Sequence, residues 1–190
     1  DTCTDNQGHT YTKSVTITGI TWWYAKIATS AGTFTVTTFG NNSSANANCI
    51  LEVAGVNPTT AIDGTPGSVN HPGFDATSLS LGAGTSTQTN DLILLLHQNG
   101  SNGQTPTYSG VMSLVASDVT GGTSSRISVG KGSVSTIAAQ TAAVSWPSID
   151  AYDAVALLVK GSPQPTINTQ PTNVSVLDSD IAIFTVAATG

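Results

Sequence analysis

The feature that most constrains this chain is a series of short segments rich in β-branched and aromatic residues, separated by turn residues. Residues 10–18, 21–29 and 33–39 follow one another in this way. In the first and third segments apolar and polar residues alternate, which places successive side chains on opposite faces of a strand. A helix would instead repeat its apolar residues every three or four positions. We therefore expect this part of the chain to form strands.

The rest of the first 160 residues continues the same pattern. The composition of residues 57–77, which include Pro58, Pro66 and Pro72, is typical of a long ordered loop. About ten short strands with no strong helix between them predict an all-β fold, an antiparallel β-sandwich of jelly-roll type. The further strands are expected at residues 48–56, 77–81, 91–98, 111–116, 124–130, 134–139 and 151–160.

A change in composition near residue 161 predicts a boundary. Residues 1–161 would form the sandwich, and residues 162–171, with three prolines, a stiff extended connector. Two further strands are expected within residues 172–190, at 173–177 and 181–188. Because two strands cannot bury a core alone, this segment is either the start of a second domain or a tail that pairs with another chain.

The small number of charged residues excludes some partners. Only 8% of the 190 residues are charged, the five Lys and Arg are scattered, and the formal net charge is −6. Nucleic-acid binding needs clustered cations to neutralise phosphates, so we expect no nucleic-acid partner. The longest apolar run is strand length, far below the roughly 20 residues that span a bilayer, so we expect no membrane insertion. The sparse charge favours an extracellular protein.

Two cysteines, Cys3 and Cys49, lack the paired spacing of a zinc site. The hypothesis is a disulfide that ties the N-terminal segment to a core strand in an oxidising compartment. The alternative is a pair of buried free thiols.

Three adjacent aromatic residues make the one candidate binding surface. On a strand, Trp22 and Tyr24 share one face and Trp23 lies on the other. Trp22 and Tyr24 are therefore the predicted ligand-binding or partner-binding residues. In the alternative interpretation, Trp23 belongs to the core and the other two pack beneath a loop or a neighbouring subunit.

No pattern of a catalytic site is recognisable. His9, His71 and His97 are isolated, and no nucleophile elbow or metalloprotease helix accompanies them. We expect no enzyme activity, with His97 a structural histidine at the end of a buried strand and His71 a solvated loop residue. No metal site or cofactor is predicted. Ordinary turns account for the Asp and Asn pairs, and a structural calcium ion is the alternative, at Asp1, Asp5 and Asn6 or at Asp178 and Asp180.

The core is expected to come from apolar positions on one face of the alternating strands, or from runs too apolar to face water. These positions are Val15, Ile17, Trp23, Ile27, Phe34, Val36, Ile50, Val53, Ile93, Leu95, Val155, Leu157 and Val159.

Several segments carry a resemblance to known modules: DNQGHTY at 5–11, WYAK at 23–26, LEVAGV at 51–56, and Trp146 followed by AVALLVK at 154–160. With these, the first 160 residues resemble a secreted, lectin-like jelly-roll β-sandwich module of bacteria and phages. Residues 165–190 are similar to the opening strands of a bacterial immunoglobulin-like domain, without the core Trp that the next strand of that family carries. The resemblance implies display and adhesion, and it transfers no catalytic residue.

Together these observations predict a non-enzymatic structural or display module of an extracellular assembly at a cell or virion surface. Its partners would be neighbouring copies or other subunits. One alternative is a carbohydrate-binding or adhesive module with glycan partners, and a second is an accessory domain of a secreted hydrolase.

Overall fold

The computed structural model describes residues 2–17, 20–25, 32–39, 49–100, 104–119, 126–163, 166–169 and 185–189. This part of the chain contains strands and no helix, and all strand pairs are antiparallel. The predicted all-β antiparallel fold is confirmed. The strands are β1 Thr2–Asp5, β2 Thr12–Ile17, β3 Ile20–Tyr24, β4 Val36–Phe39, β5 Ile62–Thr85, β6 Leu92–Asn99, β7 Thr107–Tyr108, β8 Met112–Val119, β9 Arg126–Ser133, β10 Ala139–Val159, β11 Thr166–Thr169 and β12 Ala187–Thr189.

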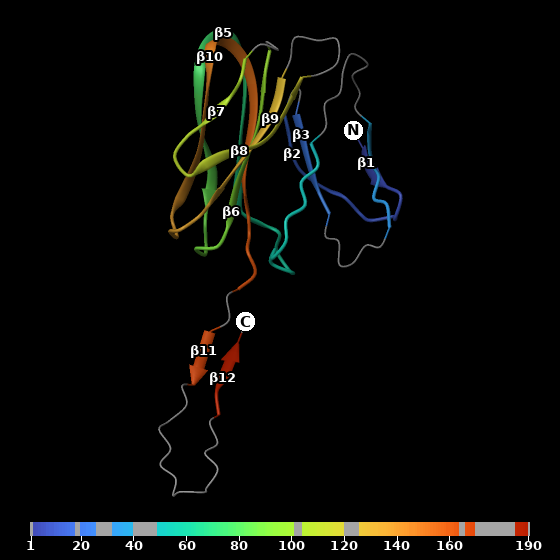
Figure 1. The fold of residues 1–190 in the computed structure, drawn as a ribbon, viewed down its shortest axis with the longest axis vertical. Helices are drawn as coiled ribbons and strands as arrows, with labels where there is room; N and C mark the ends of the chain where they lie inside the picture. The colour runs from blue at the N-terminus through green and yellow to red at the C-terminus, as the bar shows by residue number, and fades with distance from the viewer. Residues whose placement is uncertain are drawn as a thin grey trace, which may run out of the picture.

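The sandwich is built from one six-stranded sheet, in the order β5-β10-β6-β9-β8, with β7 added beside β10. Two long strands take part in both of its layers. Residues 62–71 of β5 pair with residues 152–159 of β10, while residues 76–85 pair with residues 139–150. The register shifts between these two blocks, so both strands turn a corner together and the sheet folds over on itself (Figure 1).

Glycines allow the two halves of β5 to pack closely against each other at one edge of the sandwich. A Cβ at Gly67 would overlap the backbone carbonyl of Gly82, so the two halves of the strand touch there. Gly84 has a φ of 113°, in the region that side chains disfavour, and a Cβ on it would lie 3.1 Å from the carbonyl oxygen of Thr65.

The central strands of the sheet bury both of their faces. One core cluster lies between the folded layers and includes Leu95, Val144 and Trp146. The second lies on the opposite face, which the β2–β3 hairpin and residues 49–56 cover. Burial on both faces explains why β6 and the second half of β10 read as continuous apolar runs. The members of this second cluster are Ile20, Leu94, Leu96, Val129, Val155, Leu157 and Val159.

The prediction of a loop at residues 57–77 is wrong, because residues 62–77 belong to β5. Pro66 and Pro72 suggested a loop, since proline cannot donate to a strand ladder. However, β5 is an edge strand, and both prolines lie at breaks in its register with β10: Pro66 beside the shift at Ala156/Leu158, and Pro72 at the corner. Proline is tolerated at such positions.

Two predicted strands are absent. Residues 49–55 form no strand, and Val56 makes only an isolated bridge with Gly161. Residues 134–138 are a loop, and β10 begins at Ala139. In residues 49–56, alternate side chains still pack on the second core cluster, whereas the expected core residue Ile50 is 64% exposed. The alternation therefore indicated a covered face correctly but not a hydrogen-bonded strand.

Most other core predictions are confirmed. Five predicted residues are buried, namely Ile93, Leu95, Val155, Leu157 and Val159. Val15, Ile17 and Val53 are partly buried against the second cluster. Phe34 and Val36 are only half-buried, near the β1–β4 ribbon. Ile27 lies outside the described residues.

The C-terminal segment forms its own two-stranded sheet. β11 pairs with β12, with Ile167 opposite Ala188, and this ribbon lies away from the sandwich (Figure 1). Ser162 still belongs to the sandwich, because its N–H donates to the carbonyl oxygen of Gly55 at 2.6 Å. Residues 173–177 and 181–184, where strands were predicted, lie outside the described residues. The division into residues 1–161, 162–171 and 172–190 stays a prediction.

Candidate functional site

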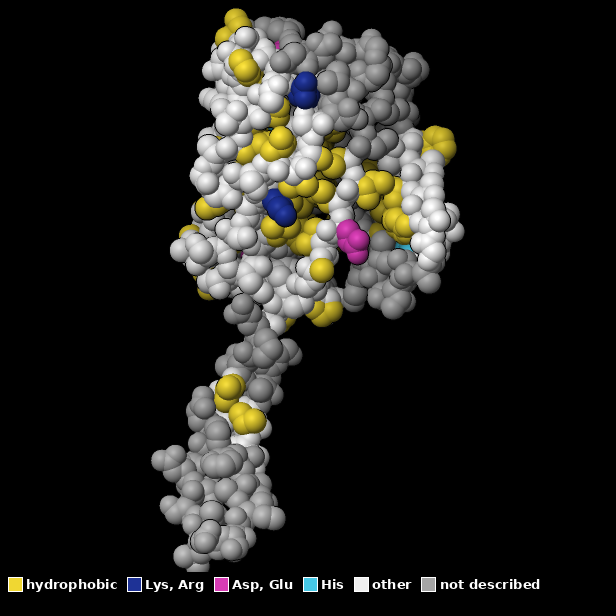
Figure 2. Space-filling model, viewed as in Figure 1, with side chains coloured by type: hydrophobic (Ala, Val, Ile, Leu, Met, Phe, Trp, Pro, Cys, Tyr) yellow, Lys and Arg dark blue, Asp and Glu magenta, His cyan; other side chains and the backbone are white. Residues whose placement is uncertain are grey.

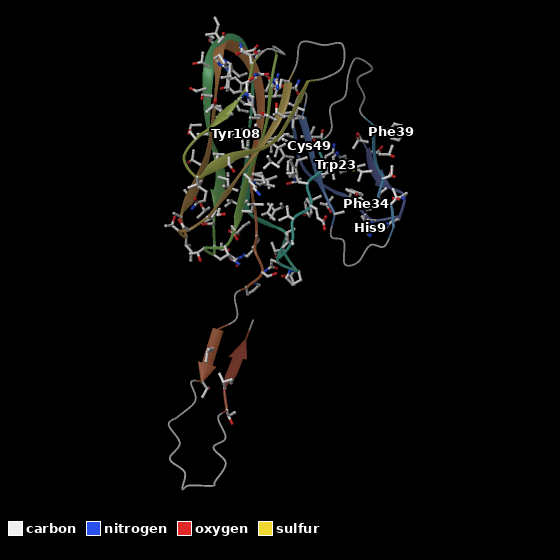
Figure 3. All side chains as sticks on the ribbon, in the orientation of Figure 1. His9, Trp23, Phe34, Phe39, Cys49 and Tyr108 are labelled. Carbon is white, nitrogen blue, oxygen red and sulfur yellow. The ribbon has the colours of Figure 1, made fainter. Side chains whose placement is uncertain are left out.

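The aromatic cluster of β3 is oriented differently from the expectation. Ile20 is buried, and Trp22 lies two residues further along the same face and packs on the second core cluster. Trp23 lies on the opposite face, where the Nζ of Lys13 is 5.3 Å from the centroid of its ring (Figure 3). The expectation that Trp23 belongs to the core is therefore wrong. Tyr24 is half-buried, and a binding role for Trp22 and Tyr24 stays a prediction.

Cys3 and Cys49 are free thiols, so the predicted disulfide is not present in the structure. The reason is that they belong to different parts of the fold. Cys3 lies in β1 opposite Thr38 of β4, whereas Cys49, labelled in Figure 3, packs on the second core cluster. Burial raises the pKa of both thiols, and Asp5 adds to this for Cys3.

The N-terminal acidic segment forms a turn. Oδ1 of Asp5 accepts hydrogen bonds from the N–H groups of Gln7 and His9, and its Oδ2 lies 3.0 Å from Nδ1 of His9. The side chain of Asn6 bonds the backbone of Thr33 and Thr35. These are the ordinary turn roles that Asp and Asn play. Among the described residues, no three His, Cys, Asp or Glu side chains are grouped to hold a metal ion, and Asp1, Asp178 and Asp180 lie outside them.

A cleft of about 240 Å³ opens at the corner where β5 and β10 turn. Three segments that are distant in the sequence meet there: the end of the first half of β5, the end of β6, and the corner of β10. The strand register brings them together, because Tyr152 is opposite both His71 and Asn99. The cleft is lined by Asn70, His71, Pro72, Gln98, Asn99, Gly100, Ala151, Tyr152 and Asp153.

One wall of the cleft is aromatic. The His71 ring stacks on Tyr152 with centroids 4.8 Å apart, and the Tyr152 ring is tilted by 59° against Trp146, with centroids 5.2 Å apart. The expectation that His71 is a solvated loop residue is therefore wrong, because it is a half-buried member of β5. Burial raises the pKa of Tyr152, with Asp75 contributing, so its hydroxyl stays protonated at neutral pH.

The other wall carries amide and carboxyl groups. Nδ2 of Asn70 donates to Oδ1 of Asp153, and Nε2 of His71 contacts Oδ1 of Asp75. Burial raises the pKa of Asp153, which the hydrogen bond from Asn70 partly offsets. Asn99 is 1% exposed, and neither polar atom of its side-chain amide has a hydrogen-bond partner in the part of the chain that the structure describes. The cleft thus combines a flat aromatic face with hydrogen-bonding groups of both kinds.

A buried polar cluster lies behind the aromatic wall. His97 stacks on Trp146 with centroids 4.7 Å apart, and its Nδ1 lies 3.4 Å from Oγ of Ser128. Ser128 in turn contacts the hydroxyl of Tyr108 at 3.0 Å. Burial lowers the pKa of His97 to about 4, so the ring is neutral at neutral pH. His97 is therefore the buried structural histidine that the sequence suggested.

The sequence gives little sign of this cleft. Asn70 and His71 fall in the predicted loop, Asn99 falls at a predicted loop tip, and residues 151–153 fall in a strand without a marked polar motif. Only the pairing of β10 with both β5 and β6 brings these residues together.

Comparisons of the chain with protein-family models, with curated proteins and with solved structures found no match. The resemblance to a jelly-roll module and to an immunoglobulin-like repeat therefore stays a prediction. No helix in the described part of the chain is long and apolar enough to cross a membrane.

Proposed function

We propose that this chain is a non-enzymatic structural or display module of an extracellular assembly at a cell or virion surface, which works through contacts with neighbouring subunits. The observation that carries the proposal is the C-terminal ribbon. β11 and β12 pair only with each other among the described strands, and a two-stranded ribbon does not bury a core by itself. A neighbouring subunit would supply the missing surface.

Apolar side chains support this assignment. Ile167 is 53% exposed and Val186 is 55% exposed, and hydrophobic side chains stand out on the ribbon in Figure 2. On the sandwich, the edge strand β8 and the turn before it expose Val111, Leu114 and Val115. An edge strand with exposed apolar residues is a ready partner for a strand of another chain.

The low charge of the chain agrees with contacts of this kind. Only 8% of the residues are charged, and Figure 2 shows few charged side chains on the face in view. Packing and backbone pairing, which need no charge complementarity, would therefore supply most of the contact energy.

Removing the ribbon should abolish assembly and leave the sandwich folded. We expect the full chain to form oligomers in native mass spectrometry, and a chain that ends at Ser162 to be monomeric with an unchanged β spectrum in circular dichroism. A sharper variant is Ile167→Asp, which should weaken oligomers at least tenfold, since it places a charge in an apolar contact. Its matched control is Thr169→Asp on the same strand, which should have a smaller effect. A monomeric full chain would contradict the proposal.

The cleft favours a second candidate function, the binding of a carbohydrate. Sugars offer both flat apolar faces and hydroxyl groups, which match the His71–Tyr152 stack and the polar groups of Asn70, Asn99 and Asp153. On a glycan array, the full chain should bind a defined set of glycans, and His71→Ala should reduce that binding at least tenfold. His9→Ala, outside the cleft, is the control. Glycan binding that survives His71→Ala would exclude this cleft, and no binding at all would exclude the function.

A further inference from the structure

A lysine and two aspartates meet at the end of β10, away from the cleft. β10 lies between β5 and β6, and Leu158 is opposite Asp63 of β5, while Val159 is opposite Leu92 of β6. Lys160, two residues after Leu158, therefore shares the face of Asp63. On the other side it is flanked by Asp91, which precedes β6. The register alone places a lysine between two carboxyl groups.

The contacts bring the reactive groups together. Nζ of Lys160 lies 3.5 Å from Oδ1 of Asp63. The other oxygen of Asp63, Oδ2, accepts hydrogen bonds from both the N–H and the hydroxyl of Thr87, each at 2.7 Å. Lys160 also donates to the Thr87 hydroxyl at 2.7 Å. Asp63, Thr87 and Lys160 therefore each contact the other two.

The two carboxyl groups are both buried, but their pKa values differ in the direction of their shift. Asp63 is 4% exposed and Asp91 is 2% exposed. Burial and the neighbouring Asp63 raise the pKa of Asp91. Burial opposes ionisation of Asp63 too, but the bonds from Thr87, the contact with Asp91 and the charge of Lys160 outweigh it and lower its pKa to about 2. The pKa values of the two carboxyl groups are therefore shifted in opposite directions, and Asp91 is the one that binds a proton more readily.

One oxygen of the Asp91 carboxyl is left without a hydrogen bond. Oδ1 of Asp91 accepts a hydrogen bond from the N–H of Gly161 at 3.1 Å, whereas its buried Oδ2 has no hydrogen-bond partner among the described residues at normal geometry. An unpaired buried carboxyl oxygen is costly for stability alone. Because Asp91 interacts with Asp63, it is suited to exchange a proton with that carboxyl group.

We propose that Lys160 and Asp63 condense into an intramolecular amide bond, with Asp91 as the residue that transfers the protons. The ammonium of Lys160 first gives one proton to the Asp63–Asp91 carboxyl pair, which leaves a free electron pair on Nζ. Nζ then attacks Cγ of Asp63, the Nζ–Cγ bond forms, and the Cγ–Oδ1 bond breaks. Oδ1 leaves as water with two protons from the lysine ammonium, and Asp91 returns to its starting protonation state. The reaction needs no other reactant, because the ammonium and the carboxylate together contain the atoms of the amide and one water.

The geometry favours this step. The two donors of Thr87 on Oδ2 stabilise the negative charge that this oxygen carries when Cγ becomes tetrahedral. The fold holds the amine and the carboxyl in contact, which replaces a slow reaction between separate molecules by one within the molecule. Burial of the two carboxyl groups strengthens each of these interactions.

The amide bond would anchor the C-terminal end of β10, where the chain leaves the sandwich. Lys160 is followed at once by Gly161, which bridges to Val56, and by Ser162, whose N–H donates to the carbonyl oxygen of Gly55. A covalent link to Asp63 joins the end of β10 to the start of β5. Force applied to the C-terminal segment could then not separate β10 from β5 at this end. This proposal does not depend on the assembly function. In an assembly, the bond would help a subunit under mechanical load to stay folded.

The test is the intact mass of the denatured full chain. We expect a mass lower than that of the sequence by one water, and a branched peptide joining the Asp63 and Lys160 segments after digestion. Lys160→Arg keeps the positive charge but cannot form the amide, so it should have the full mass and a melting temperature lower by roughly 10 °C. Asp91→Asn should also have the full mass, because it removes the proton carrier while both reacting groups remain.

Lys131→Arg is the matched control, since Lys131 is an exposed lysine of β9, and it should keep the loss of water. Asp63 precedes Gly64, and an Asp-Gly step can itself lose water as a cyclic imide. That product would persist in Lys160→Arg and give no branched peptide. A full mass in the unaltered chain, or water loss that survives Lys160→Arg, would overturn the proposal.

Discussion

Leu95→Ala is expected to lower the free energy of unfolding by about 2–5 kcal/mol. Leu95 lies in the middle of β6, between β10 and β9, and its side chain is 0% exposed within the first core cluster. Removing it takes away buried apolar surface and leaves a cavity that the paired strands on both sides cannot close. The measurement is equilibrium unfolding in denaturant, followed by tryptophan fluorescence.

The matched control is Leu114→Ala, the same change on the edge strand β8, where the side chain is 47% exposed. It should cost less than about 1 kcal/mol. Comparable losses for the two variants, or a loss below about 0.5 kcal/mol for Leu95→Ala, would show that β6 is not the centre of the core.

The stability of the fold is expected to fall by about 3 kcal/mol as the pH drops from 6.5 to 4, because of His97 alone. Burial lowers the pKa of this histidine from 6.5 to about 4, so the unfolded chain binds a proton in this range that the folded chain does not. The contribution is complete above pH 6.5 and is lost as the pH falls toward 4.

His97→Phe isolates this effect, because phenylalanine keeps a ring beside Trp146 and removes the titrating group. The variant should lose about 3 kcal/mol less than the unaltered chain between pH 6.5 and 4, whatever its stability at neutral pH. Urea unfolding at several pH values, read by the fluorescence of Trp146 and the other tryptophans, measures the difference. Equal pH profiles for the two proteins would contradict the burial of a neutral His97.

The strands that could be predicted were those whose side-chain pattern reflects their own surroundings. β6 and the second half of β10 are apolar on both faces because both faces are covered, and this is visible in Leu92 to Leu96 and in Ala154 to Val159. Of β5, only residues 77–81 were predicted as a strand; residues 62–76 could not be, since their prolines are acceptable only at an edge and at a corner. Neither the edge nor the corner exists until β10 pairs with it.

The candidate sites depended even more on long-range pairing. Trp22 and Tyr24 were predicted as binding residues because three aromatic residues are adjacent in the sequence. Which of these side chains faces the core depends on Ile20 and on the sheet that it packs against. Asp63, Asp91 and Lys160 are far apart in the sequence and carry no motif. Their meeting is a consequence of β10 lying between β5 and β6.

By itself the sequence determined the all-β class, the apolar strands at the centre of the sheet, and the sparse charge, because alternation, apolar runs and composition are properties of each segment alone. The tertiary structure decided the rest. The corner of β5 and β10, the cleft beside it, the separation of Cys3 from Cys49 and the cluster around Lys160 all depend on which strands become neighbours. Contacts of this kind join residues many positions apart, and no local pattern records them.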